Sequence, residues 1–327
     1  MPFTTDSLHF DVGQEIQAIA EGIRTAVRGT LRRRGAVIAV SGGIDSAACA
    51  ALCVQALGPE HVLLVCLPEE SSSPDSLRLG QLLAEVLGAR VEVDDVTELL
   101  RATGCYLRQT EAIREVFPDY GDGWKHKLTL PSILEGDRLN VSRLTVEAPS
   151  GQQHSARMAA PAYLKLVAAT NFKQRARTTM AYYHADRLNY AVAGTPNRLE
   201  YDQGFFVKHG DGAADLKPIA HLYKTQVYAL AAHVGVPAEI RRRPPTTDTF
   251  SMPQSQEEFY FSLPYDKMDV CLYGRNQGVA AADVGAVIGL TAEQVERVYK
   301  DIDQKRRTTA YLHMKPLLAE PVPEVAG

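Results

Sequence analysis

Apolar and polar residues alternate with two different periods along the first hundred positions. Short apolar runs occupy 36–40, which is rich in β-branched residues, and 61–67, and apolar and polar residues alternate over 90–94. Helical spacing of apolar residues marks the stretches before and between these runs: 14–34, 45–57 and 74–87. Strands buried on both faces are continuously apolar, and strands that alternate with helices form parallel sheets. The order therefore predicts an α/β fold, with a doubly wound parallel sheet flanked by helices.

The same alternation returns in the second half of the chain. Residues 171–188 have the pattern of a long helix, 189–193 that of another buried strand, and 223–235 that of a further helix. Since these elements repeat the pattern of the first half, we expect a single domain over residues 1–327.

Two stretches interrupt the alternation. Residues 102–165 are polar with scattered glycines and show no clear period, which indicates an insert of unknown role. Residues 244–262 have the composition of a long loop, and loops of this length are often active-site lids. Residues 315–327 are expected to form a frayed tail.

Composition narrows the class of protein. Hydrophobic residues make up 45% and charged residues 23% of 327 residues, as in ordinary soluble globular proteins. A formal charge of −4 argues against a nucleic-acid partner, and the basic clusters 32–34 and 241–243 are interpreted as solvated helix ends. No apolar run reaches the roughly 18 residues of a membrane span, and five cysteines lack the spacing of a zinc site. A cytoplasmic enzyme is the expected class.

The sharpest chemical signal lies where the first predicted strand meets the next helix. It is the run Ser41-Gly42-Gly43-Ile44-Asp45-Ser46. Glycines let the backbone approach an anion, and the N–H groups of a helix start donate to phosphate oxygens. An aspartate in that first turn would repel phosphate unless a Mg²⁺ ion lay between them. The run therefore predicts a phosphate-binding loop with a metal.

This loop is similar to the SGGxDS loop of the ATP pyrophosphatase superfamily, and it lacks the Gly-Lys-Ser/Thr ending of a Walker A motif. The resemblance implies a Rossmann-like fold of the adenine nucleotide α-hydrolase type and cleavage of ATP to AMP and pyrophosphate. The loop residues implied to bind ATP are Ser41, Gly42, Gly43, Asp45 and Ser46. The loop alone leaves GMP synthetase, asparagine synthetase, tRNA-thiolating enzymes and NAD synthetase open.

Further motifs, in the same order along the chain, resemble those of the NAD synthetase family. They are Asn171-x-x-x-Arg175-x-Arg177, Gly194-Thr195-x-Asn197-x-x-Glu200, Gly204-x-Phe206-x-Lys208-x-Gly210-Asp211-Gly212 and Gln304-Lys305-Arg306-Arg307. The resemblance implies metal binding by Asp45 and Glu200, and further ATP contacts from Thr195, Lys224 and Thr246. It implies dinucleotide contacts from Arg175, Lys208, Asp215, Gln304 and Lys305. The residues implied to be catalytic are Asp45, Lys208 and Lys224.

The resemblance also implies the reaction and the partners. ATP and Mg²⁺ would serve to amidate deamido-NAD with ammonia through an acyl-adenylate, in a homodimer. Only about 35 residues precede the first predicted strand, too few for a glutaminase domain, so free ammonia or a separate ammonia donor is expected. Pro196 and Gln304 depart from the family motifs and keep a second hypothesis open, a related ligase that adenylates another carboxylate. A tRNA-modifying enzyme and a non-catalytic nucleotide-binding module are less favoured.

Overall fold

A four-stranded parallel sheet forms the centre of the protein, in a computed structural model that describes residues 3–130, 133, 142–246 and 249–325. The strands run in the order β3-β2-β1-β7. Their bounds are β1 (Ala36–Ala39), β2 (Val62–Cys66), β3 (Arg90–Val93) and β7 (Ala191–Val192). Every neighbouring pair is parallel, so the predicted α/β sheet is confirmed.

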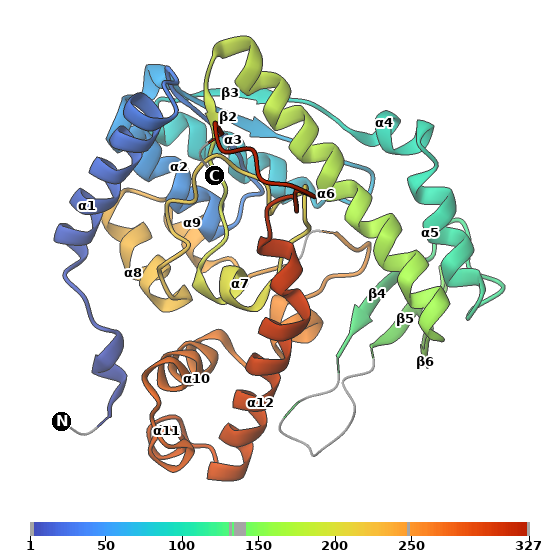
Figure 1. Cartoon of the computed structure of the whole chain (residues 1–327). Coiled ribbons are helices and arrows are strands. Elements are labelled where there is room, and N and C mark those ends of the chain that lie inside the picture. Colours follow the sequence, from blue (N-terminus) through green and yellow to red (C-terminus); the bar gives the residue numbers. More distant parts are fainter. Residues whose placement is uncertain (1–2, 131–132, 134–141, 247–248, 326–327) are drawn as a thin grey trace.

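Helices cover both faces of this sheet (Figure 1). Alternate residues of β1 point to opposite sides: Ile38 packs in one buried cluster and Val37 in another. The Ile38 side is covered by α1 (Val12–Arg24), α2 (Ile44–Leu57), α3 (Pro74–Leu87), α8 (Lys224–His233) and α9 (Ala238–Arg242). The Val37 side is covered by α4 (Thr97–Ala102) and α6 (Ala160–Leu188).

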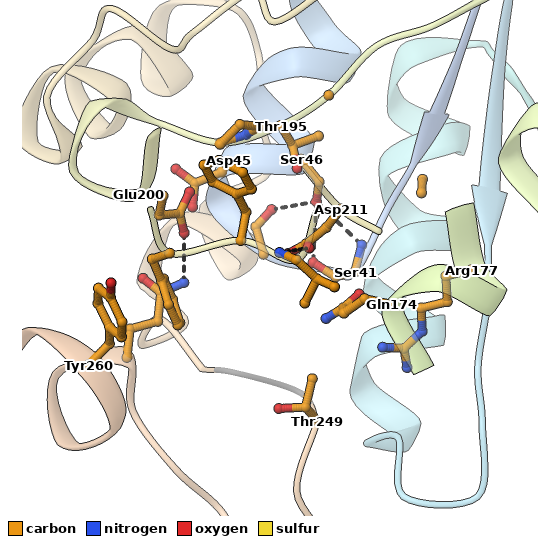
Figure 2. A pocket seen from close by; sticks show the side chains of 18 of the residues that line it. Ser41, Asp45, Ser46, Gln174, Arg177, Thr195, Glu200, Asp211, Thr249 and Tyr260 are labelled. Atoms are coloured by element: carbon orange, nitrogen blue, oxygen red, sulfur yellow. Dashed lines mark hydrogen bonds between the residues drawn. The ribbon is translucent and has the colours of Figure 1, made fainter. Parts of the chain in front are cut away.

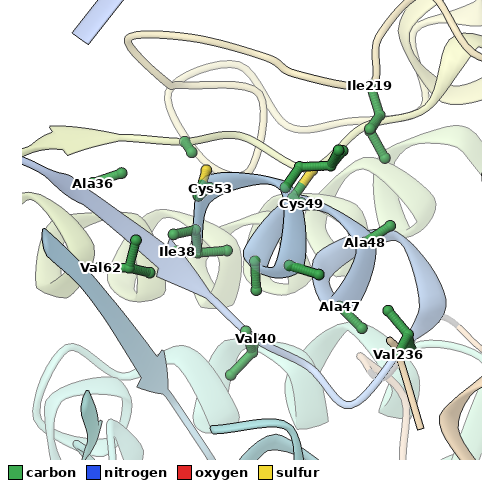
Figure 3. Packing of buried hydrophobic residues seen from close by; sticks show 14 of the residues in the cluster. Ala36, Ile38, Val40, Ala47, Ala48, Cys49, Cys53, Val62, Ile219 and Val236 are labelled. Atoms are coloured by element: carbon green, nitrogen blue, oxygen red, sulfur yellow. The ribbon is translucent and has the colours of Figure 1, made fainter. Parts of the chain in front are cut away.

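Helix α2 is apolar around nearly its whole circumference because it lies between the sheet and other helices. Figure 3 shows Cys49 and Cys53 of α2 near Ile38 of β1. Both thiols are fully buried, and burial raises the pKa of Cys53 to about 12, so these cysteines serve as small core residues. This packing fixes the start of α2, and therefore the predicted phosphate loop, against the end of β1.

Three predicted bounds differ from the structure. The helix predicted over 14–34 loses α-helical bonding after Arg24 and continues as a π-helical turn, Thr25–Thr30. The strand predicted over 189–193 shortens to two residues, because Asn189 takes a left-handed φ of 55° that ends α6. Helix α6 begins at Ala160, so the last residues of the predicted insert belong to it.

The rest of the predicted insert has regular structure that its sequence did not reveal. It contains α5 (Cys105–Arg114) and an antiparallel sheet of β4 (Lys125–Thr129), β5 (Arg143–Glu147) and β6 (Gln153–Arg157), in the order β4-β5-β6. The strands are short and most of their side chains are polar, which hides the period of two. Residues 131–132 and 134–141 of the predicted insert, and 247–248 of the predicted lid, lie outside the described residues.

A second helical layer completes the chain. It contains α7 (Arg198–Gln203), α10 (Tyr265–Gln277), α11 (Ala281–Ile288) and α12 (Ala292–Thr309), whose apolar side chains form a separate buried cluster. Short helical turns lie at Thr5–Leu8, Pro59–His61, Glu257–Phe261 and Ala310–His313. Residues 314–325 are exposed. Within the described ranges, no helix is both long and apolar enough to cross a bilayer.

The insert core contains a buried histidine whose titration should weaken the fold in acid. Burial, and then the charge of Lys173, lower the pKa of His126 to about 3 from the ordinary 6.5. The unfolded chain binds a proton at His126 between those values and the folded chain does not, so stability falls as pH drops from about 6.5 to 3. The loss should be about 5 kcal/mol over that range.

Denaturant titrations from pH 7 to pH 4 measure this effect. We expect His126→Gln to flatten the pH dependence of the unfolding free energy. His154→Gln, on the exposed strand β6, should leave it steep. Equal slopes for the wild type and His126→Gln would contradict the assignment.

Candidate active site

A cavity of about 630 Å³ opens at the carboxyl ends of the parallel strands. Residues that follow β1, β2 and β7 line its floor, and α6, α12 and the segment 249–260 contribute side chains to its walls. Ligands of open α/β sheets bind at this edge. Of the residues predicted for the site, the cavity lining includes Ser41, Gly43, Asp45, Ser46, Arg175, Thr195, Glu200, Lys208, Lys224, Thr246, Gln304 and Lys305.

The phosphate loop is held in shape by its own serines. Ser46 Oγ accepts a hydrogen bond from the backbone N–H of Ser41 at 3.3 Å and donates to the Gly43 carbonyl at 3.1 Å. Gly42 has a φ of +70°, and a Cβ there would lie 3.0 Å from the Ser76 carbonyl oxygen. Helix α2 begins directly after this turn, so its free N–H groups face the cavity. The loop therefore has the form of an anion site.

Arg243 lines the same cavity and supports the loop, and the sequence did not identify it. Its Nη1 donates to the carbonyls of Ser41 and Gly42, each at 3.3 Å, and its Nη2 donates to Ser76 Oγ at 3.1 Å. The interpretation of the cluster 241–243 as a solvated helix end is therefore wrong for Arg243. An isolated charge run carries no sign of which member turns inward.

Replacing Arg243 should weaken ATP binding without unfolding the protein. Arg243→Ala removes charge-assisted bonds to the loop, so the KM for ATP should rise about tenfold, with kcat changed less. Arg243→Lys should recover little, because an ammonium cannot reproduce the planar fork. The exposed neighbour Arg242 offers the matched control, Arg242→Ala. Indistinguishable ATP kinetics for the two alanine variants would refute this role.

Two carboxylates and one ammonium group meet beside the loop. Asn197 joins the carboxylates: its Nδ2 donates to Asp45 Oδ1 at 3.1 Å and its backbone N–H to Glu200 Oε2 at 3.0 Å. Lys224 Nζ pairs with Asp45 Oδ2 and is buried. Figure 2 shows Asp45 and Glu200 on the same side of the cavity, near Thr195 and Ser46. The metal-ligand pair predicted from the sequence therefore lies together.

The charges of this cluster are strongly coupled. Burial, and then the negative charge of Asp45, raise the pKa of Glu200. Burial alone would lower the pKa of Lys224, but the neighbouring Asp45 and Glu200 outweigh it and raise the pKa. Gln256 Nε2 also donates to Glu200 Oε1 at 3.0 Å. Among the described residues, Lys224 is the cation that interacts with both acids, so the pair carries an excess of negative charge and is a suitable place for a hard divalent ion.

A group of three metal-ligating acids, histidines or cysteines does not occur within the described part of the chain. Mg²⁺ does not require one, because it is commonly held by one or two carboxylates together with substrate phosphates and water. Asp45 and Glu200 fit that arrangement, with the phosphate loop alongside.

The cavity lining also carries groups suited to an anionic substrate. Arg175 Nε donates to the Lys208 carbonyl at 3.3 Å. Lys208 Nζ donates to the carbonyls of Tyr311 and Met314 at 2.7 and 3.0 Å. An ammonium group has three N–H donors, so one remains for a ligand. Asp211 also lines the cavity, and its surroundings raise its pKa to about 6 through desolvation.

Two of the predicted dinucleotide contacts are already engaged. Lys305 Nζ pairs with Asp301 at 2.6 Å and donates to the Tyr260 carbonyl at 2.7 Å, and burial lowers its pKa. Asp215 is not among the residues that line the cavity, and its Oδ2 accepts the backbone N–H of Val192 at 2.8 Å. In this chain Asp215 therefore supports the end of β7, and the structure does not bring it to the other site residues.

A buried ion pair beside the site was missed. Lys173 and Glu69 are both fully buried, with Nζ and Oε1 3.0 Å apart, and Tyr106 donates to Glu69 at 2.9 Å. Four residues later on α6, Arg177 donates to the Leu67 carbonyl at 3.0 Å and to Ser72 Oγ at 3.0 Å. Together they fix the loop after β2. The i, i+4 spacing of two cations on one helix was a usable signal.

Comparison with known proteins identifies the family of this chain. The sequence profile of the NAD synthase family matches residues 15–117 and 137–309. The NH(3)-dependent NAD(+) synthetase of Mesorhizobium japonicum is 58% identical over 317 residues, which cover 97% of this chain and 99% of the relative. That of Rhizobium meliloti is 56% identical over 323 residues, with 99% and 96% covered.

Solved structures share the fold. An NMN synthetase from Francisella tularensis superimposes with a TM-score of 0.65 at 21% identity, over 95% of this chain and 99% of that one. An NH3-dependent NAD synthetase from Campylobacter jejuni gives 0.61 at 20% identity, over 95% and 100%. Fold, phosphate loop, coupled acids and sequence match agree: the chain belongs to the NAD synthase family.

Proposed function

We propose that the protein is an ammonia-dependent NAD synthetase, a ligase that forms a C–N bond at the expense of ATP. The observation that carries the proposal is the phosphate loop beside the coupled pair Asp45 and Glu200, in a chain that is 58% identical to an NH(3)-dependent NAD(+) synthetase. A ligase acting on an unrelated carboxylate has no such support. The tRNA-modifying and non-catalytic alternatives likewise have none.

The reaction divides into two transfers. A carboxylate oxygen of deamido-NAD attacks the α-phosphorus of ATP, and pyrophosphate leaves with the electrons of the broken P–O bond. Ammonia then attacks the acyl carbon, and AMP leaves to give NAD after loss of a proton. Both steps need positioning and charge neutralisation more than covalent help from the protein.

The ATP side is assigned to the loop and its neighbours. Ser41, Gly42, Gly43 and Ser46 bind the departing pyrophosphate through backbone and hydroxyl donors at the start of α2. Lys224 neutralises charge that develops on the phosphates. Thr195 and Thr246 line the same cavity, and we assign both of them to contacts with the nucleotide.

Mg²⁺ belongs to the same proposal. Asp45 and Glu200 would hold the ion, and it would supply positive charge to the triphosphate. Asn197 and Gln256 orient the two carboxylates through their hydrogen bonds.

The acid substrate is assigned to the part of the cavity lining that contains Lys208 and Arg175. Lys208 and Arg175 offer cations for a pyrophosphate-bridged substrate, and Gln304 and Lys305 lie on the same cavity. Asp215 contacts the dinucleotide only if the ligand extends beyond the cavity of one chain.

We also propose that the protein is a homodimer. Helix α6 carries Arg175 on an exposed face together with Leu164 and Tyr183, which are 64% and 57% exposed. Large apolar side chains in such positions are common at subunit interfaces. Light scattering of the purified protein measures the mass, and 35.8 kDa rather than twice that value would refute the dimer. Because ATP is a substrate, we place the enzyme in the cytoplasm, with ammonia free or delivered by a separate donor.

Product analysis tests the function. Purified enzyme, ATP, Mg²⁺ and ammonium are incubated with deamido-NAD, and in parallel with nicotinate mononucleotide because one fold neighbour is an NMN synthetase. We expect NAD, AMP and pyrophosphate in equal amounts from the dinucleotide. No product from deamido-NAD together with turnover of nicotinate mononucleotide would show that the mononucleotide is the substrate.

A further inference from the structure

The small antiparallel sheet lies against a segment of the predicted lid. Residues 249–258, here called the closing segment, follow the outer edge of β4 (Figure 1). Met252 N–H donates to the His126 carbonyl at 3.1 Å, and Leu130 N–H donates to the Glu258 carbonyl at 2.9 Å. Between these bonds, Gln254 Nε2 donates to the Leu128 carbonyl.

These contacts use every second residue from His126 to Leu130, which directly follows β4. β4 is an edge strand of its sheet, and alternate residues of an edge strand turn their N–H and C=O groups away from the sheet. Residues 126, 128 and 130 all direct such groups to the closing segment. The insert therefore offers a row of backbone partners with a fixed spacing.

Side chains strengthen the same contact. Phe250 of the closing segment is buried in the insert core with Leu128, Leu144 and Val146. Ser251 Oγ accepts the His126 backbone N–H at 2.9 Å and lies 3.2 Å from His126 Nδ1. The insert and the closing segment therefore contribute side chains to the same hydrophobic core.

The other side of the closing segment forms part of the active-site wall. Thr249 and Gln256 line the cavity, and Gln256 reaches Glu200. Lys173, buried under the segment, donates to the Thr249 carbonyl at 3.4 Å. Figure 2 places Thr249 across the cavity from Glu200 and Asp45.

We propose that the insert is a positioning element of the active site: its edge strand holds the closing segment so that Gln256 orients Glu200 and the wall beside ATP keeps its shape. Ser251 and Gln254 are positioning residues, since they touch the insert and do not line the cavity. This inference rests on the proposed function for its kinetic readout. A purely structural alternative is that the segment only protects an exposed strand edge from aggregation.

The double variant Ser251→Ala/Gln254→Ala tests the inference. We expect kcat/KM for ATP to fall about tenfold, mainly through KM, and chymotrypsin to cut faster after Phe250 and Phe259. Saturating MgATP should restore resistance to cleavage. The single variant Ser251→Thr, which keeps the hydroxyl, should have most of the ATP affinity of the wild type. Thr145→Ala, on β5 away from the segment, is the control.

Two outcomes would overturn the inference. One is faster cleavage with kcat/KM for ATP within twofold of the wild type, which leaves only edge protection. The other is unchanged cleavage and unchanged kinetics. The Kd for ATP, measured by calorimetry, reports the loss of ATP affinity without requiring turnover. Inactivity of the wild type toward deamido-NAD would therefore reject the proposed function and still leave this test decisive.

Discussion

Asp45→Asn should lower the rate of AMP formation by about 10²–10³-fold or more, while the folded protein persists. The substitution keeps the size of the side chain and removes one of the two charges that face the phosphate loop. Asn197 Nδ2 can still donate to the amide oxygen of the new asparagine, so the side chain keeps this hydrogen bond. The carboxylate that neutralises Lys224 and completes the proposed metal pair is lost. Steady-state AMP release with saturating ATP and Mg²⁺ measures the effect.

The matched control is Asp75→Asn. Asp75 occupies the first turn of α3 as Asp45 occupies that of α2, but it is exposed and paired with Arg78. Surface pairs of this kind contribute about 0–1 kcal/mol, so AMP release should not change. A normal rate for Asp45→Asn would contradict the assignment of the acid pair.

Lys224→Met should abolish turnover and also destabilise the protein by about 3–5 kcal/mol. Lys224 is buried, and its removal leaves the Asp45 carboxylate without its cation and next to Glu200. Methionine fills a similar volume, so the loss is electrostatic rather than a cavity effect. Thermal unfolding and AMP release, measured on the same preparation, separate stability from activity.

A second substitution distinguishes the two roles of Lys224. Adding Glu200→Gln to Lys224→Met removes one of the two neighbouring acids that repel each other. Stability should therefore recover in part, while activity stays absent. Lys165→Met on the surface is the control, because Lys165 is 62% exposed in its pair with Glu115. Recovery of activity in the double variant would show that Lys224 acts only as a structural counter-ion.

The parallel sheet and the phosphate loop were predictable because their signals are local. A buried parallel strand is apolar throughout, and the Ser41–Ser46 loop lies directly after one. The pairing of Asp45 with Glu200, 155 positions apart, needed the family resemblance as well, since the two acids come together only through the order of the strands.

The remaining features depend on contacts that spacing does not encode. Arg243 differs from Arg242 only in the direction that the chain turns after α9. β4 contains a single apolar residue, Leu128, and its other buried residue is the polar His126. The alternation of buried and exposed positions in β4 therefore cannot be recognised from the sequence. Asp215 matches a family motif, yet its carboxylate is turned to β7 and away from the cavity.

The acyl-adenylate is the centre of this account, and oxygen transfer tests it most directly. Deamido-NAD labelled with ¹⁸O in the nicotinate carboxylate is converted with ATP and ammonium, and the products are analysed by mass spectrometry. Attack of the carboxylate on the α-phosphorus predicts one ¹⁸O in each AMP and none in pyrophosphate. Unlabelled AMP, or label in inorganic phosphate released with ADP, would contradict it.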